Sequence, residues 1–153
     1  MPCLPTDARC PVIVRDTCPF CAIVAGNAPA RVVAETPTSV SFLPDVPAVL
    51  GHVLVVPRCH VSDLWDLDEE QARALGADVL ATSRVVRDAL QPAGLNIIQS
   101  NGAAAGQSVF HLHVHVVPRT ADDRMPDLWP KDAHWDTAQL DSVARELRSE
   151  TLG

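Results

Sequence analysis

Three histidines alternate with apolar residues in the segment Phe110-His111-Leu112-His113-Val114-His115-Val116-Val117-Pro118. Successive side chains of an extended strand point to opposite faces, so the three histidines would share one face and the apolar residues the other. An imidazole titrates near neutral pH and can act as a nucleophile, a proton carrier or a metal ligand. Because the whole chain has six histidines, three of them within five positions favour a catalytic or metal-binding site over a surface strand with incidental histidines.

A short loop with two glycines precedes this segment, and its composition suits an anion. It runs from Asn101 to Ser108 and contains Gly102 and Gly106. Glycines let backbone N–H groups approach an anion closely, and the Gln107 and Ser108 side chains add donors. Together, the loop and the histidines suggest a phosphate held against a histidine nucleophile, although an ordinary hairpin loop has a similar composition.

Cys18 and Cys21 form a Cys-x-x-Cys pair whose two thiols can bind one metal ion. The chain has five cysteines and shows no signal-peptide pattern at its N-terminus, so this spacing favours metal or redox chemistry over disulfides. No βαβ pattern surrounds the pair, which argues against a thioredoxin-like redox site. The alternatives are a metal site, which needs two further ligands, and a reduced pair without metal.

The segment from Gly106 to Arg119 resembles the signature of the histidine triad (HIT) family, and weaker similarity extends back to Cys18. In that signature three histidines alternate with apolar residues after Gly-Gln-Ser or Gly-Gln-Thr. The resemblance, which is to the small bacterial Hint-like type, implies an α+β fold. This fold has a five-stranded, mainly antiparallel sheet, one long helix and a short C-terminal helix. It also implies a homodimer.

The resemblance implies a nucleotide hydrolase that acts at the α-phosphate of a purine nucleoside phosphoramidate. His113 would attack phosphorus and form a covalent nucleotidyl-histidine intermediate, while the backbone carbonyl of His111 holds its other nitrogen. His115 would donate to phosphate oxygens, and Ser108 would relay a proton to the leaving amine. Three alternatives stay open: a diadenosine-polyphosphate hydrolase, a zinc-stabilised nucleotide-binding protein with vestigial activity, and, more distantly, a nucleotidyl-sugar transferase.

The resemblance also assigns residues to zinc and to nucleotide. A structural zinc would be bound by Cys18, Cys21, His60 and His111. The residues expected to contact the nucleotide are Phe20, Phe42, Leu43, Asp45, His52, Asn101, Gln107 and Ser108, with Ala28 as a further apolar wall. One departure concerns the ribose, because Pro44 stands where the family usually has an acidic residue and Asp45 follows one place later.

The elements that must position these residues can be predicted from pattern. Apolar and β-branched runs predict strands over 31–35, 39–43, 51–57 and 95–99 in addition to the histidine segment. A single apolar stripe predicts a long helix over 68–90, with acidic residues in its first turn, and a shorter one over 136–147. We therefore expect an N-terminal arm (1–17) with a β-like patch at 12–14, a HIT domain (18–120), and a C-terminal extension (121–153) that packs on the domain or on a dimer partner.

Composition limits the remaining classes of function. The 153 residues are 47% hydrophobic, which suits one folded domain. The net charge of −7 offers no basic surface for a nucleic-acid backbone. No apolar run is long enough to span a membrane, and without a visible export signal we expect a cytoplasmic protein.

Overall fold

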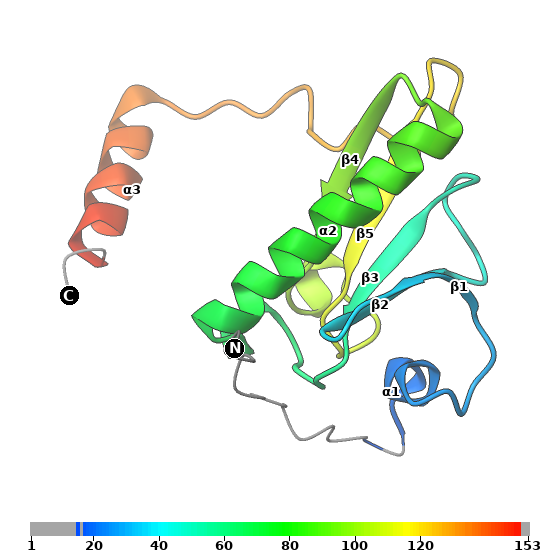
Figure 1. Ribbon diagram of the computed structural model, residues 1–153. Helices are drawn as coiled ribbons and strands as arrows, with labels where there is room; N and C mark the ends of the chain where they lie inside the picture. Colours follow the sequence, from blue (N-terminus) through cyan, green and yellow to red (C-terminus); the bar gives the residue numbers. More distant parts are fainter. Residues whose placement is uncertain (1–14, 16, 151–153) are drawn as a thin grey trace, which may run out of the picture.

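The computed structural model describes residues 15 and 17–150 and contains one five-stranded antiparallel sheet (Figure 1). The strands lie in the order β1-β2-β3-β5-β4, and every neighbouring pair is antiparallel. Their bounds are β1 Arg31–Glu35, β2 Ser39–Leu43, β3 Val53–Pro57, β4 Gly94–Ile98 and β5 Val114–Arg119. The predicted α+β class and the five-stranded sheet are confirmed.

The long helix α2 (Glu69–Leu90) covers one face of the sheet (Figure 1). Asp68 begins it with a capping box, in which its carboxylate accepts from the backbone N–H of Gln71 and the Gln71 amide oxygen accepts from the N–H of Asp68. Leu75 and Val86 lie on its buried side. They pack in one core cluster with sheet residues that include Val53, Val55, Leu112, Val114 and Val116.

The short helix α1 (Pro19–Val24) packs against the opposite face of the sheet. Its Phe20, Ile23 and Val24 cover a second core cluster that consists of Val40, Phe42, Leu54 and Val56. Because side chains alternate along a strand, residues next to those in the α2 cluster point toward this second face. His115, which lies between Val114 and Val116 in β5, therefore faces the α1 side.

The predicted histidine strand is regular only from Val114 onward, which corrects the expected strand over the whole segment. The preceding residues pair elsewhere, since the backbone N–H of Leu112 donates to the carbonyl of Val61 at 2.8 Å. The alternation nevertheless continues in space, because Leu112 is buried in the α2 cluster with Val114. Likewise, β3 begins at Val53 because the predicted 51–57 strand starts with a turn, in which Gly51 has φ +86°.

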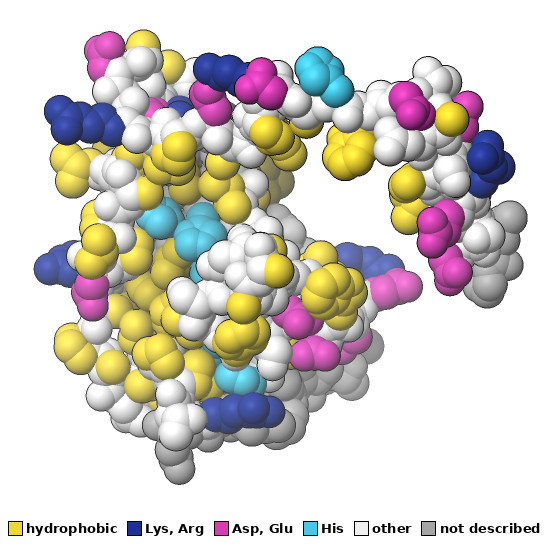
Figure 2. Space-filling model, turned by 180° about the vertical axis from the view of Figure 1, so that it is seen from behind, with side chains coloured by type: hydrophobic (Ala, Val, Ile, Leu, Met, Phe, Trp, Pro, Cys, Tyr) yellow, Lys and Arg dark blue, Asp and Glu magenta, His cyan; other side chains and the backbone are white. Residues whose placement is uncertain are grey.

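The C-terminal helix α3 (Thr137–Glu150) buries none of its residues and stands apart from the sheet in both views (Figures 1 and 2). Its apolar side chains Leu140, Val143 and Leu147 are all exposed. Whether the C-terminal extension packs on a partner therefore stays a prediction. The predicted patch at 12–14 and nearly all of the N-terminal arm lie outside the described residues. No helix in the described part of the chain is long and apolar enough to cross a membrane.

Candidate active site and metal site

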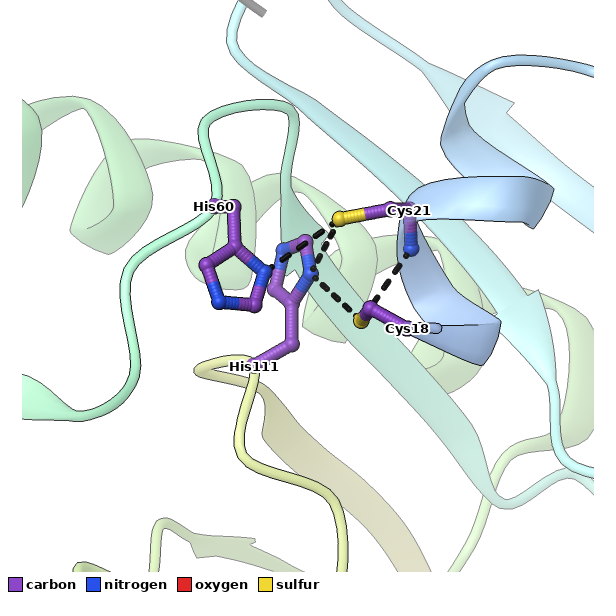
Figure 3. Close-up of side chains that lie close together, drawn as sticks. All are labelled: Cys18, Cys21, His60 and His111. Atoms are coloured by element: carbon purple, nitrogen blue, oxygen red, sulfur yellow. Dashed lines mark hydrogen bonds between the residues drawn. The ribbon is translucent and has the colours of Figure 1, made fainter. Parts of the chain in front are cut away.

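Cys18, Cys21, His60 and His111 come together from three separate parts of the chain (Figure 3). Cys18 caps the N-terminus of α1 and Cys21 lies in its first turn, while His60 follows β3 and His111 precedes β5. The four potential ligand atoms lie within 4.8 Å of one another. Neither cysteine is part of a disulfide, so the structure brings together all four residues that were expected to bind zinc.

The spacing within this cluster can be compared with tetrahedral zinc. With Zn–S near 2.3 Å and Zn–N near 2.0 Å, neighbouring sulfur and nitrogen ligands of such an ion lie about 3.5 Å apart. The Sγ atom of Cys21 is 3.2 Å from Nδ1 of His60 and 3.5 Å from Nδ1 of His111, and Sγ of Cys18 is 3.4 Å from Nδ1 of His111. The donor set and its spacing therefore fit a closed tetrahedral site for a zinc-like ion.

The protonation of His111 also suits a ligand role. Its Nε2–H donates to the backbone carbonyl of Pro57 at 2.9 Å, which leaves the Nδ1 lone pair directed at the thiols. Burial lowers the pKa of His111 to about 4, so the ring is neutral at physiological pH. Burial also lowers the pKa of His60 and raises the pKa of the Cys21 thiol, so metal binding would displace a thiol proton.

His113 lies beside the cluster and is nearly fully buried. Its Nδ1–H donates to the backbone carbonyl of His111 at 2.7 Å. The other nitrogen, Nε2, therefore carries a lone pair when the ring is neutral. The Phe20 ring packs against the His113 ring in an edge-to-face arrangement, and the two ring centroids are 5.1 Å apart. Such an imidazole, fixed at one nitrogen and basic at the other, is arranged for nucleophilic attack.

His52 and His115 form a second imidazole pair next to His113. The Nε2 atom of His52 lies 2.9 Å from Nδ1 of His115, and the backbone N–H of Ala48 donates to Nδ1 of His52 at 3.1 Å. The rings of His113 and His115 are 4.9 Å apart. Burial, together with the neighbouring His113, lowers the pKa of His52, and the same causes with His52 added lower that of His115 to about 4.

The loop that precedes the histidines is held by side chains expected to bind phosphate. Both N–H bonds of the Gln107 amide are donated to backbone carbonyls, those of Ser62 and Val109, and its oxygen accepts from the N–H of Gly102. The Asn101 oxygen likewise accepts within the protein, from the backbone of Leu64 and the amide of Gln99. Gln107 therefore anchors the loop instead of offering the expected donor, which leaves exposed Ser108 and backbone amides.

A cavity of about 340 Å³ lies against Ser108 and against Cys18 and His60 of the cysteine and histidine cluster. Its polar lining includes Arg15, Thr17, Ser62 and Ser108, and the lining is completed by Cys18, Pro19, His60, Val109 and Phe110. Within the part of the chain that the structure describes, no carboxylate lines this cavity. Arg15, Thr17 and Ser62 could not be assigned to the site from sequence, because isolated polar residues carry no pattern of their own.

The expected nucleoside-binding residues are divided between the two faces of the sheet. Viewed from the side opposite α2, histidine side chains lie in a hollow among hydrophobic ones (Figure 2). Phe20 belongs to this side, and fully buried Phe42 supports it from within the core in an edge contact at 5.6 Å. Leu43, however, packs against the cluster beneath α2. Asp45 is fully exposed, with its carboxylate 3.6 Å from the Arg31 guanidinium.

Known proteins are similar to this chain in sequence and in fold. The HIT domain model matches residues 25–122. An adenosine 5′-monophosphoramidase of Schizosaccharomyces pombe is 36% identical over 107 residues, which are 70% of this chain and 77% of the relative. A crystal structure of SMU.412c from Streptococcus mutans superposes with a TM-score of 0.83 at 37% identity, covering 90% of this chain and 87% of that one.

A solved structure that contains metal is also similar. The zinc-bound histidine triad family protein from Mycobacterium smegmatis is 36% identical, with a TM-score of 0.68 over 88% of this chain and 97% of that one. The sequence match spans more than half of the chain, and the structures agree in fold. The chain therefore belongs to the HIT family.

Proposed function

We propose that this protein is a nucleotide hydrolase that cleaves purine nucleoside phosphoramidates at the α-phosphate, with His113 as the nucleophile. The observation that carries the proposal is the 2.7 Å hydrogen bond from Nδ1 of His113 to the carbonyl of His111. In the neutral ring it leaves a lone pair on Nε2, on the face of the sheet that carries the other histidines. The name of the Schizosaccharomyces pombe relative, an adenosine 5′-monophosphoramidase, supports the class of substrate.

The first step forms a bond between Nε2 of His113 and phosphorus while the bond from phosphorus to the leaving nitrogen breaks. Ser108 gives its hydroxyl proton to the leaving nitrogen and recovers a proton from solvent. In the second step the oxygen of a water molecule bonds to phosphorus, the bond from phosphorus to His113 breaks, and a proton returns to solvent. The net reaction is hydrolysis of the phosphoramidate to the nucleoside monophosphate and the amine.

The carbonyl of His111 stabilises the positive charge that His113 acquires when its second nitrogen is nucleotidylated. The backbone amides of the loop from Gly102 to Ser108, together with His115, would face the charge that develops on the phosphate oxygens. Gln107 contributes by holding this loop against Ser62 and Val109. Phe20, whose ring packs against His113, would contact the nucleoside, and the ribose contact of Asp45 stays a prediction.

We further propose that zinc binds to Cys18, Cys21, His60 and His111. When bound, zinc supplies structural cross-linking of α1, the segment after β3 and the approach to β5. The His111 side chain, fixed between this cluster and the Pro57 carbonyl, would then steady the backbone carbonyl that orients His113. The zinc-bound Mycobacterium smegmatis protein and the spacing of the ligand atoms support this assignment.

A dinucleoside polyphosphate is the second candidate substrate, and the cavity beside Ser108 favours it. A leaving group on that side would occupy space lined by the cationic Arg15 and three hydroxyl side chains. Such a lining can accept a phosphate chain as well as an amine.

We also propose that the chain forms a homodimer, since the apolar side of α3 is exposed in the single chain.

The decisive experiment measures AMP release from adenosine 5′-phosphoramidate, with intact mass recorded during turnover. We expect rapid release and a transient nucleotidyl adduct in the wild type, and neither in His113→Ala. His134→Ala, a change at an exposed histidine far from the cluster in sequence, serves as the matched control and should behave as wild type. Tight AMP binding without release from this substrate or from diadenosine polyphosphates would refute the hydrolase and favour a binding protein.

A further inference from the structure

We infer that the backbone N–H of Ala48 acts through His52 to fix the tautomer of His115, so that His115 presents a neutral Nε2–H toward the phosphate. Ala48 and His52 are thus positioning residues, one through its main chain and one through its ring. The catalytic consequence rests on the proposed function, whereas the tautomer itself follows from the hydrogen bonds alone.

The backbone N–H of Ala48 has an unambiguous role in this arrangement. A backbone N–H can only donate, so Nδ1 of His52, 3.1 Å from the nitrogen of Ala48, must accept. A neutral His52 then carries its hydrogen on Nε2. A hydrogen on Nδ1 would instead place two donors against each other and leave a buried polar group unpaired, which is unfavourable.

The tautomer of His52 in turn determines that of His115. Nε2–H of His52 is 2.9 Å from Nδ1 of His115, so Nδ1 of His115 accepts and its hydrogen lies on Nε2. The two nitrogens point in divergent directions from an imidazole ring, and the Nε2–H of His115 therefore points away from His52. A second proton on either ring would break this chain of donors and acceptors, so both rings must be neutral for it to form.

The surroundings of the pair agree with two neutral rings. The titratable groups that contact His115 among the described residues are His52 and His113, and those residues place no carboxylate in hydrogen-bonding contact with either ring. His52 is itself buried. Without a nearby negative charge, a buried imidazolium would be costly.

His113 and His115 consequently hold opposite tautomers although their rings are only 4.9 Å apart. A main-chain carbonyl, that of His111, keeps the hydrogen of His113 on Nδ1 and leaves a nucleophilic Nε2. A main-chain N–H, that of Ala48, acts through His52 to keep the hydrogen of His115 on Nε2. The backbone thus divides two identical side chains into a nucleophile and a donor.

The test reads the tautomers directly by NMR of the protein with ¹⁵N-labelled histidine at pH 7, with signals assigned from single histidine variants. We expect His52 and His115 to be protonated at Nε2 only and His113 at Nδ1 only. Protonation of Nδ1 of His115, or of both its nitrogens, in the wild type would overturn the inference. This outcome is read from the wild-type protein and does not depend on whether a variant folds.

Two substitutions at His52 then distinguish a role in setting the tautomer of His115 from a role in packing alone. His52→Gln retains an N–H that can donate to His115 and an oxygen that can accept from Ala48, so it should keep the Nε2–H tautomer and most of the turnover. His52→Glu offers only acceptors, so it should move a proton to Nδ1 of His115 and lower kcat by about 10²-fold or more, the loss typical of one preorganised donor.

The outcomes distinguish this inference from the proposed function. An unchanged His115 tautomer in folded His52→Glu would overturn the inference, whatever the activity. A wild type that shows the expected tautomers but hydrolyses neither a phosphoramidate nor a dinucleoside polyphosphate would refute the proposed function and leave the tautomer assignment standing. His134→Gln is the matched control and should alter neither spectrum nor turnover.

Discussion

The carbonyl oxygen of His111 accepts the Nδ1–H of His113 at 2.7 Å, while the side chain of His111 belongs to the cluster with Cys18, Cys21 and His60. One residue therefore contacts the proposed nucleophile through its main chain and the proposed metal ligands through its side chain. Because the Nε2–H of this side chain is also bonded to the Pro57 carbonyl, its position is fixed from two sides. If the cluster binds metal, loss of that metal should consequently disturb the orientation of the His113 ring.

The first prediction tests that link. Cys21→Ser should lower bound zinc to well below one per chain and reduce kcat by about 10- to 100-fold, the range seen when groups that orient a metal ligand or a catalytic residue are lost. Zinc content by mass spectrometry and phosphoramidate turnover measure the two effects. Ser149→Ala, at an exposed position on α3, is the control. Full activity in a zinc-free Cys21→Ser protein would show that the His111 carbonyl needs no metal support.

The second prediction concerns the loop anchor. Gln107→Glu keeps the size of the side chain but replaces two N–H donors with an oxygen that faces the carbonyls of Ser62 and Val109. We expect a loss of about 1–3 kcal/mol in the free energy of unfolding, the cost of unpaired buried groups, and a higher KM for nucleotide. Denaturant unfolding and steady-state kinetics are the measurements. Gln139→Glu on exposed α3, where the amide oxygen accepts from Asp136, should be neutral; equal behaviour of the two variants would contradict the anchoring role.

The third prediction follows from the lowered pKa values of His52 and His115, the latter about 4. In the unfolded chain both rings take up protons below about pH 6.5, but in the folded protein they do so only at lower pH. The unfolded state therefore binds more protons in this range, and the free energy of unfolding should fall as the pH drops from about 6.5 toward 4.

Denaturant unfolding at several pH values, with metal content held the same, measures this dependence. The slope should be shallower in His115→Gln and unchanged in His134→Gln. An identical slope in wild type and His115→Gln would mean that His115 titrates in the folded protein much as it does in the unfolded chain.

Much of the fold was predictable because its signals are local. Alternation placed Leu112, Val114 and Val116 on the core face and the histidines on the other, and Asp68 with its acidic neighbours marked the start of α2. The Cys-x-x-Cys pair and the histidine spacing were likewise enough to name the four side chains that the structure brings together, once the resemblance to the HIT family supplied His60 and His111.

The remaining features of the site depend on contacts that no local pattern encodes. Gln107 looked like a phosphate donor, yet its amide is used by Ser62, which lies 45 residues earlier. Leu43 was expected beside the nucleoside but packs under α2, because one step along a strand changes the face. The role of Ala48 belongs to its main chain, which every residue type shares, so its identity carries no signal.

The fourth prediction concerns the turn that delivers His52. Gly51 has φ +86°, and a Cβ there would collide with the side chain of Leu90 and approach that of Pro118. Gly51→Ala should therefore lower the free energy of unfolding by backbone strain of about 1–2 kcal/mol, with a smaller further loss from displacing the half-exposed Leu90 side chain. Gly26→Ala is the matched control, since Gly26 has φ +75° but nothing within 4 Å of its Cβ position. Equal losses in the two variants would show that Leu90 moves aside without cost.

The fifth prediction uses Arg15, the one cation among the described residues that line the cavity beside Ser108. If leaving groups occupy this cavity, a phosphate chain gains from the guanidinium while a departing ammonia does not. Arg15→Gln should therefore lower kcat/KM for diadenosine polyphosphates by about tenfold, the value of one hydrogen bond to a charged group, and leave phosphoramidate hydrolysis nearly unchanged. Arg73→Gln, on the exposed side of α2 where its guanidinium pairs with Glu69, controls for net charge. A contact with the leaving group must distinguish an anion from an amine. Equal losses of kcat/KM on both substrates would therefore mean that Arg15 instead stabilises the adjoining cluster of Cys18, Cys21, His60 and His111.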